Sequence, residues 1–504
     1  MAEFSQLAAV DLGSNSFQCQ VARTVGDQIY PLDALREPVR LAAGLTADKM
    51  LDDAAQARAL ACLQRFGERL RGFDRAAVRA VATNTFRVAK NAREFLTRAT
   101  SALGFPIEVI AGREEARLIY LGVAHSLPAS AERRLVVDIG GGSTECILGT
   151  QYRPHRLESL YMGCVTWSVR YFPEGRVTRH SFKQAEIAAR NELQPVSAAY
   201  ARPAWGEAVG SSGTLRAIAQ LLAANGYTDG AITPEGLARL RSTLIRAGDV
   251  SHAGLTGLRA DRIPVLPGGL AIIRAVMEEL GIERMMVADG AMREGVLYDL
   301  LGRVHRHDMR DVTVAQFMQR YHVDAAQAER VGELAATLLA IDAAPDDDAR
   351  VLRWAASLHE IGISVAYSGY HRHSAYILEN ADMPGFSRDE QQRLAALVLA
   401  HRRALRKVAA TVSACIAWRP VLALRLAALF YRHRTPIDLP PPRLAEEARG
   451  FRLQLDATWL QGNGLTVAAL HDEVREWEKI GIALRIPALD LADAAPAGSD
   501  GDGN

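Results

Sequence analysis

The sequence has few cysteines and a net charge close to zero, and each of these features excludes some classes of protein. Five cysteines occur in 504 residues, at Cys19, Cys62, Cys146, Cys164 and Cys415, and no two form a CxxC pair. Scattered single cysteines argue against a disulfide framework or a cysteine zinc site and favour reduced thiols. The formal net charge of +1 lacks the basic excess of a general nucleic-acid or membrane-surface binder, so no specific nucleic-acid partner is expected.

Long apolar segments are also missing. The N-terminus, MAEFSQLAAVDLG, has no basic stretch followed by an apolar one, and the apolar run at residues 416–430 is interrupted by Arg419 and Arg425. We therefore predict a cytoplasmic protein without stable membrane insertion. The signature GxxxxGK[ST] is absent as well, which excludes the P-loop route to phosphate binding.

What the sequence does contain is a duplicated motif. Residues 136–149, VVDIGGGSTECILG, repeat the pattern of residues 10–19, VDLGSNSFQC, so that Asp138 aligns with Asp11 at an offset of 127 residues. A repeat unit of this length is a domain, and the motif therefore indicates two related domains. The whole chain is too long for one hydrophobic core.

Two regions of different character follow one another along the chain. The first 300 residues alternate strand-like and helix-like patterns, which predicts an α/β fold. From about residue 310 helix follows helix, rich in Ala, Leu and Arg, and the prolines at 436 and 440–442 mark a further boundary. The stretch FRLQLDATWL, residues 451–460, is typical of a strand pair in a small terminal module. The last residues lack apolar periodicity and indicate a disordered tail.

Each copy of the motif is suited to hold a phosphate. An apolar strand delivers an Asp, and glycines and small hydroxyl residues follow, so backbone N–H groups can approach an anion closely. One such turn alone is more often structural, but its duplication and a third glycine/serine turn, VGSSGT at 209–214, favour an anion site. The candidate phosphate ligands are Gly13, Ser14, Asn15, Gly141, Gly142, Ser143, Thr144, Ser211, Ser212 and Gly213.

The motifs resemble those of a known family. VDLGSNSF, VDIGGGSTE and VGSSGT are similar to the phosphate and adenosine motifs of the actin, sugar kinase and Hsp70 superfamily. Together with GREEARLIYLGV, MGCVTW, GSSGTLRA and ADGAMREGVLY, they resemble the exopolyphosphatase and guanosine pentaphosphate phosphohydrolase family, most closely its long-form bacterial exopolyphosphatases. The resemblance implies an α/β fold of two actin-like (ribonuclease H-like) domains with the site in the cleft between them.

The resemblance and the composition together predict five segments. These are an actin-like domain I (1–126), an actin-like domain II (127–308), an α-helical HD-like domain (309–435), a small C-terminal module (436–487) and a disordered tail (488–504). The HD signature His-Asp is here His359-Glu360, so we expect a degenerate HD-like domain without catalysis. Basic residues of this domain could line a path for a long polyanion: His371, Arg372, His373, His401, Arg402, Arg403, Arg406 and Lys407.

Hydrolysis of a phosphoanhydride requires a positioned water, a base and cations that offset the phosphoryl charge. Glu114 and Glu115 begin a predicted helix, where acids are commonly present only because they suit the helix dipole. The resemblance implies that Glu115 is the catalytic base and that Glu114 is structural. It also implies that Arg87, at the end of TNTFR, contacts phosphate.

Carboxylates on the two motifs are candidate metal ligands. Asp138 and Glu145 lie seven residues apart across a tight hairpin, which suits magnesium held with waters against a phosphate, and the resemblance implies the same pair. Asp11 is the equivalent of Asp138 in the first motif and is a third candidate. Potassium is a candidate activator.

The substrate remains open between related alternatives. The leading prediction is a magnesium-dependent exopolyphosphatase that removes terminal orthophosphate from inorganic polyphosphate processively. SGYHRHSAYILENADMPGF and DIGGGSTE favour it, whereas MGCVTW also suits the pentaphosphate enzymes. The alternatives are a guanosine pentaphosphate (pppGpp) 5'-phosphohydrolase and a nonenzymatic polyphosphate or alarmone sensor. The resemblance further implies a homodimer.

Overall fold

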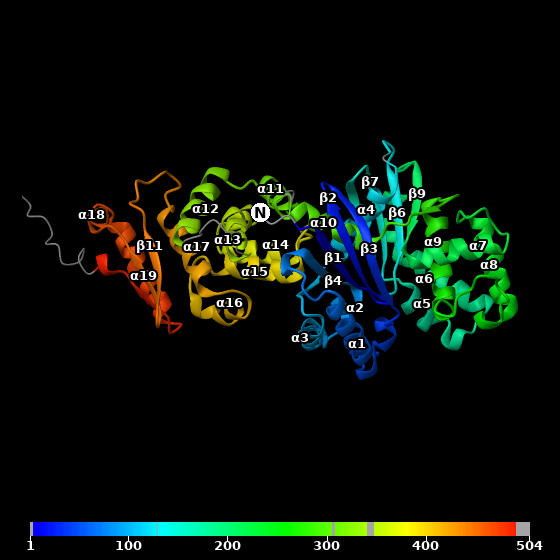
Figure 1. The fold of residues 1–504 in the computed structure, drawn as a ribbon. Helices are drawn as coiled ribbons and strands as arrows, with labels where there is room; N and C mark the ends of the chain where they lie inside the picture. Colours follow the sequence, from blue (N-terminus) through cyan, green and yellow to red (C-terminus); the bar gives the residue numbers. More distant parts are fainter. Residues whose placement is uncertain (1–3, 129, 305–307, 340–346, 490–504) are drawn as a thin grey trace, which may run out of the picture. The chain divides into compact units, whose positions relative to one another are not determined.

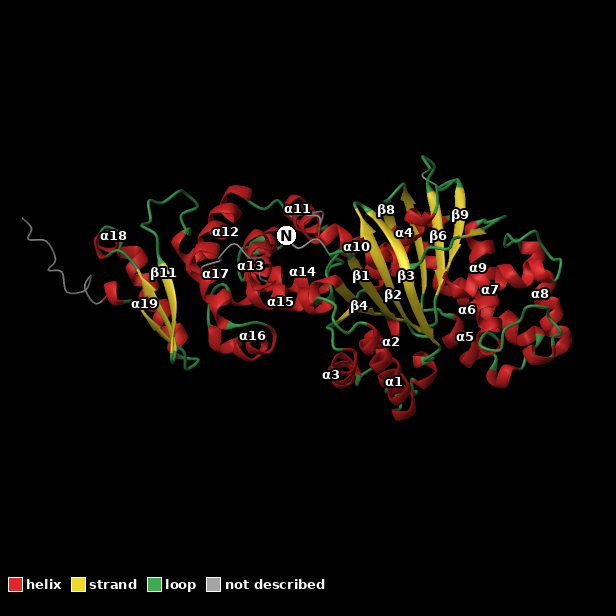
Figure 2. Cartoon of the chain, in the orientation of Figure 1, coloured by secondary structure: helices red, strands yellow, loops and turns green. Residues whose placement is uncertain are grey.

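The computed structural model describes residues 4–128, 130–304, 308–339 and 347–489 (Figure 1). The chain divides into two compact units, Met1–Met309 and Arg310–Asn504, called here the first and the second unit. The first unit combines two large sheets with helices, and the second is mainly helical with one small sheet (Figure 2). The predicted mixed α/β fold is therefore confirmed.

The two sheets of the first unit have the same topology. Their strand orders are β3-β2-β1-β4-β5 and β8-β7-β6-β9-β10. In each, the central strand pairs antiparallel with the strand after the motif turn and parallel with a later strand. The duplication in the sequence is thus a duplication of structure. The strands are β1 Gln6–Leu12, β2 Phe17–Val25, β3 Gln28–Glu37, β4 Val78–Ala82, β5 Ile107–Val109, β6 Arg134–Ile139, β7 Thr144–Thr150, β8 Arg153–Leu160, β9 Glu207–Ser211 and β10 Met286–Val287.

The helices of the first unit begin where the sequence supplies capping residues. Asp52 accepts a hydrogen bond from the backbone N–H of Ala55, and Thr178 forms a capping box with Ser181. Their buried faces form the cores that support the sheets. These helices are α1 Asp53–Arg69, α2 Asn84–Val88, α3 Ala92–Leu103, α4 Gly112–Ser126, α5 Cys164–Tyr171, α6 Arg179–Tyr200, α7 Ser212–Ala224, α8 Pro234–Ala247, α9 Leu266–Leu280 and α10 Met292–Val304.

The second unit has one continuous core. Leu397 and Leu426 of its helices belong to the same cluster as Leu453 and Trp477 of the terminal region. The small sheet has the order β11-β12-β13, formed by β11 Arg443–Glu447, β12 Gly450–Gln454 and β13 Ala483–Arg485. The helices are α11 Met309–Arg320, α12 Ala325–Leu339, α13 Asp347–Leu358, α14 Tyr370–Asn380, α15 Arg388–Ala400, α16 Ala409–Cys415, α17 Trp418–Phe430, α18 Ala457–Gln461 and α19 Gly464–Glu478.

Two expectations for the terminal region need comment. The predicted strand pair at 451–460 is half wrong, because the Asp456 side chain accepts a hydrogen bond from the Trp459 N–H and starts helix α18 instead. Of the predicted disordered tail, Ala488 and Leu489 are buried in the core of the second unit, and the remaining residues, 490–504, lie outside the described part of the chain.

Within the described residues, no single helix has the length and apolar character needed to cross a membrane. Helices α16 and α17 pass that test only as a pair, and the chain bends by 120° between them.

A half-buried histidine in the first unit is expected to make stability depend on pH. The His125 ring stacks on Tyr298, with 3.6 Å between ring centroids, and lies 4.5 Å from Tyr152. Burial lowers the pKa of His125 from its ordinary value of 6.5 to about 4. The unfolded chain therefore binds the proton more readily, so this site costs no stability above pH 6.5 and progressively more as the pH falls from 6.5 to 4.

The variant His125→Phe should weaken that acid sensitivity while keeping the ring stack. Because the side chain is only partly buried, we discount the full effect for solvent and expect a difference of about 1 kcal/mol between pH 7 and pH 5. Thermal unfolding of both proteins across this range measures it. Parallel pH profiles for the two proteins would contradict the assignment.

Candidate active site

The two motif turns meet at a cavity of about 130 Å³ in the first unit. They approach so closely that a Cβ at Gly141 would lie 2.9 Å from the backbone nitrogen of Asn15. This explains the glycine, because no side chain would fit there. The predicted residues that line the cavity are Asp11, Gly13, Ser14, Asn15, Glu115, Asp138, Gly141, Gly142, Ser143, Ser212 and Gly213.

Four predicted residues do not line it. Thr144 is fully buried and donates to the Met162 carbonyl, and Ser211 donates to the Gly290 carbonyl. Glu145 is 1% exposed and accepts a hydrogen bond from Ser159 at 2.7 Å. The Arg87 guanidinium bonds Glu115 at 2.8 Å and the Ile110 carbonyl at 3.0 Å. Arg87 therefore positions Glu115 in this structure, and contact between Arg87 and phosphate stays a prediction.

The carboxylates of the motifs occupy equivalent places in the two sheets. Asp138 lies opposite Glu145 in the β6–β7 pair, and Asp11 lies opposite Gln18 in the β1–β2 pair. Burial, with the charge of Glu115 nearby, raises the pKa of both Asp11 and Asp138 to about 7. Burial and the neighbouring carboxylates also hold the pKa of Glu145 well above its usual range. Such a cluster of buried acids is stabilised by a cation.

Two further motifs border the cavity, through Cys164 and Ser212. The N-terminus of α5, within MGCVTW, donates from the Cys164 N–H to the Gly140 carbonyl at 2.9 Å and from the Val165 N–H to the Gly141 carbonyl at 3.0 Å. At the β9–α7 turn, Ser212 has a φ of 86°. A non-glycine residue in this conformation is strained, and such strain is concentrated at functional turns.

Four arginines at the cavity were not singled out from the sequence. Arg36, Arg216, Arg262 and Arg293 all line it, and they come from segments far apart in the chain. Arg216 and Arg293 belong to the motifs GSSGTLRA and ADGAMREGVLY, which was a usable signal. Arg36 and Arg262 carry no such signal in this Arg-rich sequence. Together they supply the positive charge that a phosphate chain requires.

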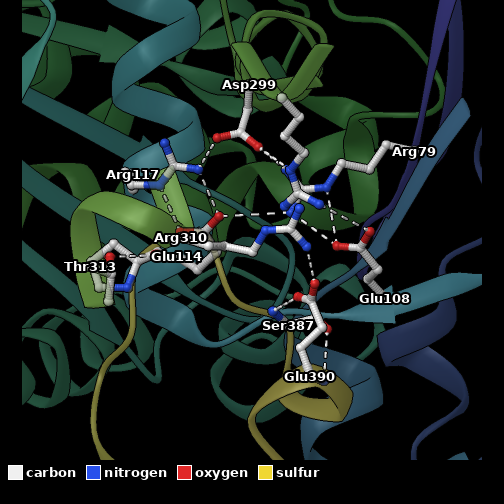
Figure 3. A network of polar contacts seen from close by, with 11 residues as sticks. Arg79, Glu108, Glu114, Arg117, Asp299, Arg310, Thr313, Ser387 and Glu390 are labelled. Carbon is white, nitrogen blue, oxygen red and sulfur yellow. Dashed lines mark hydrogen bonds and ion pairs between the residues drawn. The ribbon is translucent and has the colours of Figure 1, made fainter. Parts of the chain in front are cut away.

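A buried ion-pair network holds the helix that carries Glu115. Its neighbour Glu114 accepts two hydrogen bonds from Arg117, at 2.7 and 2.8 Å, as expected for a structural acid. Asp299 of α10 accepts from Arg117 and, at 2.7 Å, from Arg79 of β4 (Figure 3). These arginines lower the pKa of Asp299. The network therefore ties α4 to α10 and to the first sheet.

Helices α4 and α10 also pack unusually closely. A Cβ at Gly295 of α10 would lie 1.8 Å from the Leu118 carbonyl oxygen of α4, so only glycine permits the contact. Residues Glu114–Tyr120 of α4 are all buried. Glu115 thus projects from a helix with little freedom to move, which is the condition for holding a water in one attack position.

Arg36→Ala should separate activity from stability. Burial and the neighbouring Arg262 lower the pKa of Arg36, and the described residues offer it no carboxylate ion pair. We therefore expect kcat/KM to fall about 10- to 100-fold, the effect of losing a charged hydrogen bond, while the unfolding temperature stays constant or rises. Steady-state kinetics and thermal unfolding measure both quantities. The control Arg113→Ala removes an exposed arginine that pairs with Glu158; an equal loss of activity in it would contradict the prediction.

The residues at the cavity fit a magnesium ion held jointly with a phosphate. The Asp11 Oδ1 atom is buried and has no hydrogen-bond partner, and Asp138 lines the same cavity. No group of three or more His, Cys, Asp or Glu side chains among the described residues forms a closed metal site. Magnesium commonly keeps several waters and binds through one or two carboxylates and substrate oxygens, which matches this set.

Fold and site together define a phosphoanhydride hydrolase of the actin-like ATPase fold. Residues 20–304 match the Ppx/GppA phosphatase family, and residues 309–474 match domain III of the Ppx/GppA phosphatases. The chain therefore belongs to the Ppx/GppA phosphatase family. This confirms the predicted family and the prediction of an enzyme rather than a nonenzymatic sensor.

Individual relatives refine the comparison. A Vibrio cholerae protein named guanosine-5'-triphosphate,3'-diphosphate pyrophosphatase is 38% identical over 487 residues, covering 95% of this chain and 97% of the relative. A crystal structure of the Aquifex aeolicus member of the Ppx/GppA family is 26% identical with a TM-score of 0.50, covering 59% of this chain and 98% of that one. An exopolyphosphatase structure from Cytophaga hutchinsonii, 23% identical with a TM-score of 0.54 and the same coverage of both chains, shows the fold alone.

These comparisons favour the predicted alternative over the leading prediction. A relative that matches nearly the whole chain is named guanosine-5'-triphosphate,3'-diphosphate pyrophosphatase, and the comparisons do not single out polyphosphate as the substrate. The substrate motifs in the sequence were therefore weighted too strongly toward exopolyphosphatase.

Proposed function

We propose that this protein is a magnesium-dependent pppGpp 5'-phosphohydrolase, which converts pppGpp and water to ppGpp and orthophosphate. The main support is the 38% identity, over 95% of this chain, to a protein named for this substrate. Inorganic polyphosphate is the second candidate, because the family to which the chain belongs includes exopolyphosphatases.

The cavity supports the chemistry of this proposal. Glu115 accepts a proton from a water as the water oxygen bonds to the terminal phosphorus, and the bond from that phosphorus to the bridging oxygen breaks. The electron pair leaves with the bridging oxygen on ppGpp, and the proton passes from Glu115 to solvent. Arg87 holds the Glu115 carboxylate in position through the 2.8 Å hydrogen bond.

The remaining groups bind the phosphate chain. The N–H groups of the two motif turns and the guanidinium groups of Arg36, Arg216 and Arg262 offset its charge. Asp138 and Asp11, which line the cavity, would hold magnesium. Glu145, the third predicted ligand, does not line the cavity, and its contact with the metal stays a prediction. When bound, magnesium withdraws charge from the phosphoryl oxygens. A potassium activator and a homodimer stay predictions, which activity assays in sodium and potassium buffers and light scattering would test.

The proposal is tested by orthophosphate release from pppGpp and from long-chain polyphosphate, with purified protein and Glu115→Gln as the blank. We expect kcat/KM for pppGpp to exceed the value for polyphosphate, per chain end. A clear preference for polyphosphate, with long chains degraded without the appearance of intermediate lengths, would instead support the processive exopolyphosphatase.

Removal of divalent metal should abolish the activity. Treatment with EDTA leaves Asp11, Asp138 and Glu115 facing the phosphates without a cation between them, so substrate binding and turnover both fail. We expect activity to return on addition of magnesium in excess of EDTA. Full activity in EDTA would contradict the assignment of the carboxylates.

A further inference from the structure

A second cavity, of about 880 Å³, lies entirely within the second unit. Its volume is in the range of pockets that hold small organic ligands. It is lined by residues of α12, α14, α17 and α19 and by the segments that follow α13, α15 and α17. None of the residues that line the first cavity, at the two motif turns, contributes to this second cavity.

The charges that line this cavity do not balance. Seven basic side chains face four acidic ones. Each of the four acids forms an ion pair with one of the basic side chains. The other three basic side chains, Arg402, Arg403 and Arg432, have no carboxylate partner among the described residues. The four matched pairs are Glu360–Arg434 at 2.6 Å, Glu473–Arg425 at 2.8 Å, Glu476–Lys479 at 2.5 Å and Asp472–Arg475.

Three guanidinium groups without a carboxylate partner among the described residues give the cavity a local positive charge, which an anion would offset. Arg402 is partly offset by the Tyr370 ring, 4.6 Å from its guanidinium carbon. Arg403 and Arg432 are exposed. Guanidinium groups in such an arrangement favour phosphate, which accepts paired hydrogen bonds from each of them.

An aromatic face accompanies the cations. Tyr367 lines the cavity and is 75% exposed, and its ring centroid lies 6.3 Å from that of Tyr370. An exposed tyrosine in the wall of a cavity offers a stacking surface for a nucleobase. A simple phosphate chain has no ring that could stack on this surface.

Two buried histidines add hydrogen-bond acceptors. The His359 Nδ1 lies 2.7 Å from the Ala356 carbonyl, and the His401 Nδ1 lies 2.5 Å from the Val398 carbonyl. Each Nδ1 must carry the proton, because a carbonyl only accepts. Burial lowers the pKa of both rings, so each Nε2 is an acceptor. The Tyr370 hydroxyl lies 3.4 Å from the His401 Nε2, whereas the described residues give the His359 Nε2 no hydrogen-bond donor.

A free acceptor in a cationic cavity discriminates between anions. Ionised phosphate oxygens only accept hydrogen bonds at neutral pH, so a polyphosphate chain cannot satisfy the His359 Nε2. The N–H groups of a nucleobase can. The cavity thus combines phosphate donors, a stacking surface and a base acceptor.

We propose that this cavity of the second unit binds a nucleoside diphosphate or triphosphate, with its phosphates on Arg402, Arg403 and Arg432 and its base on Tyr367. This site is separate from the catalytic cleft and does not depend on the substrate proposed for that cleft. It also revises the predicted path for a polyanion, because His401, Arg402 and Arg403 line a cavity that Arg406 and Lys407 do not line.

The test uses the full chain with Glu115→Gln, titrated with GDP and separately with pyrophosphate in calorimetry. We expect GDP to protect residues 358–372 and 400–434 from hydrogen exchange. Adding Arg403→Gln and Arg432→Gln should weaken this GDP binding at least 10-fold. The matched control adds Arg406→Gln and Lys407→Gln, which also removes two exposed charges beside the cavity, and should bind GDP unchanged.

Tyr367→Ala separates a nucleotide site from a plain phosphate site. It should weaken GDP binding about 10-fold, the loss of one base–aromatic stack, and leave pyrophosphate binding unaltered. Absence of GDP protection in those residues, or equal affinity for GDP and pyrophosphate with no effect of Tyr367→Ala, overturns the proposal. Phosphate release from pppGpp by the protein with Glu115 intact reports on the cleft, so the two proposals can fail separately.

Discussion

Glu115→Gln is expected to lower phosphate release by about 10²- to 10⁴-fold, the usual contribution of a general base. The amide keeps the size of the carboxylate and can still accept a hydrogen bond from Arg87, which now bonds Glu115 at 2.8 Å. It cannot accept the proton of the attacking water. Substrate binding should persist, so the loss should fall on kcat.

The same substitution elsewhere in the first unit provides the control. Glu158→Gln changes a partly exposed acid that pairs with Arg113 outside the cavity and should retain full activity. Orthophosphate release and thermal unfolding of both variants give the comparison. Near-normal turnover in Glu115→Gln, or an equal loss in Glu158→Gln, would remove Glu115 from the role of base.

Asp299→Asn is expected to have the largest effect on stability. Asp299 is buried and accepts hydrogen bonds from Arg79, Arg117 and Arg303. The neutral amide removes one buried countercharge from this arginine cluster, in which Arg117 keeps Glu114 and Arg79 keeps Glu108 as partners. Breaking a buried pair by removing one partner costs about 3–5 kcal/mol. We expect the first unit to unfold at a clearly lower denaturant concentration, and activity to fall in proportion to the unfolded fraction.

Glu37→Gln tests whether the loss of stability in Asp299→Asn is large because the Asp299 ion pairs are buried. Glu37 also forms an ion pair, with Arg65, but that arginine side chain is 54% exposed. Because solvent screens exposed pairs, this variant should unfold almost like the parent protein. Urea titrations followed by circular dichroism compare the three proteins. Similar midpoints for Asp299→Asn and the parent would show that the network contributes little.

Local patterns accounted for most of the fold and for part of the site. The repeat around Asp11 and Asp138 predicted two related domains, and the structure shows two sheets with the same strand order. In the structure Thr178 is the N-cap residue of α6, and this start signal is likewise local in the sequence. The error at 451–460 has a local cause too, because Asp456 is a helix start signal that the strand pattern obscured.

Local sequence patterns could not predict which side chains from distant segments come together. Nothing near Arg36 or Arg262 in the chain distinguishes them from the many solvated arginines, and only folding brings both to one cavity. Conversely, Glu145 lies opposite Asp138 across the hairpin, yet it does not line the cavity, and Ser159 of the next strand donates a hydrogen bond to one of its oxygens. Such contacts join residues that have no fixed spacing in the sequence.

Residue types at short, constant spacings were enough to predict the family, the duplicated phosphate turns and the position of the glutamate proposed as the base. Only the tertiary structure decided which charges are matched. It paired Asp299 with Arg79 and Arg117, and it left Arg402, Arg403 and Arg432 around a cavity of the second unit without a carboxylate partner among the described residues. The reason is physical: the energy of a charge depends on its burial and on its nearest countercharge, and both are set by chain segments that meet only after folding.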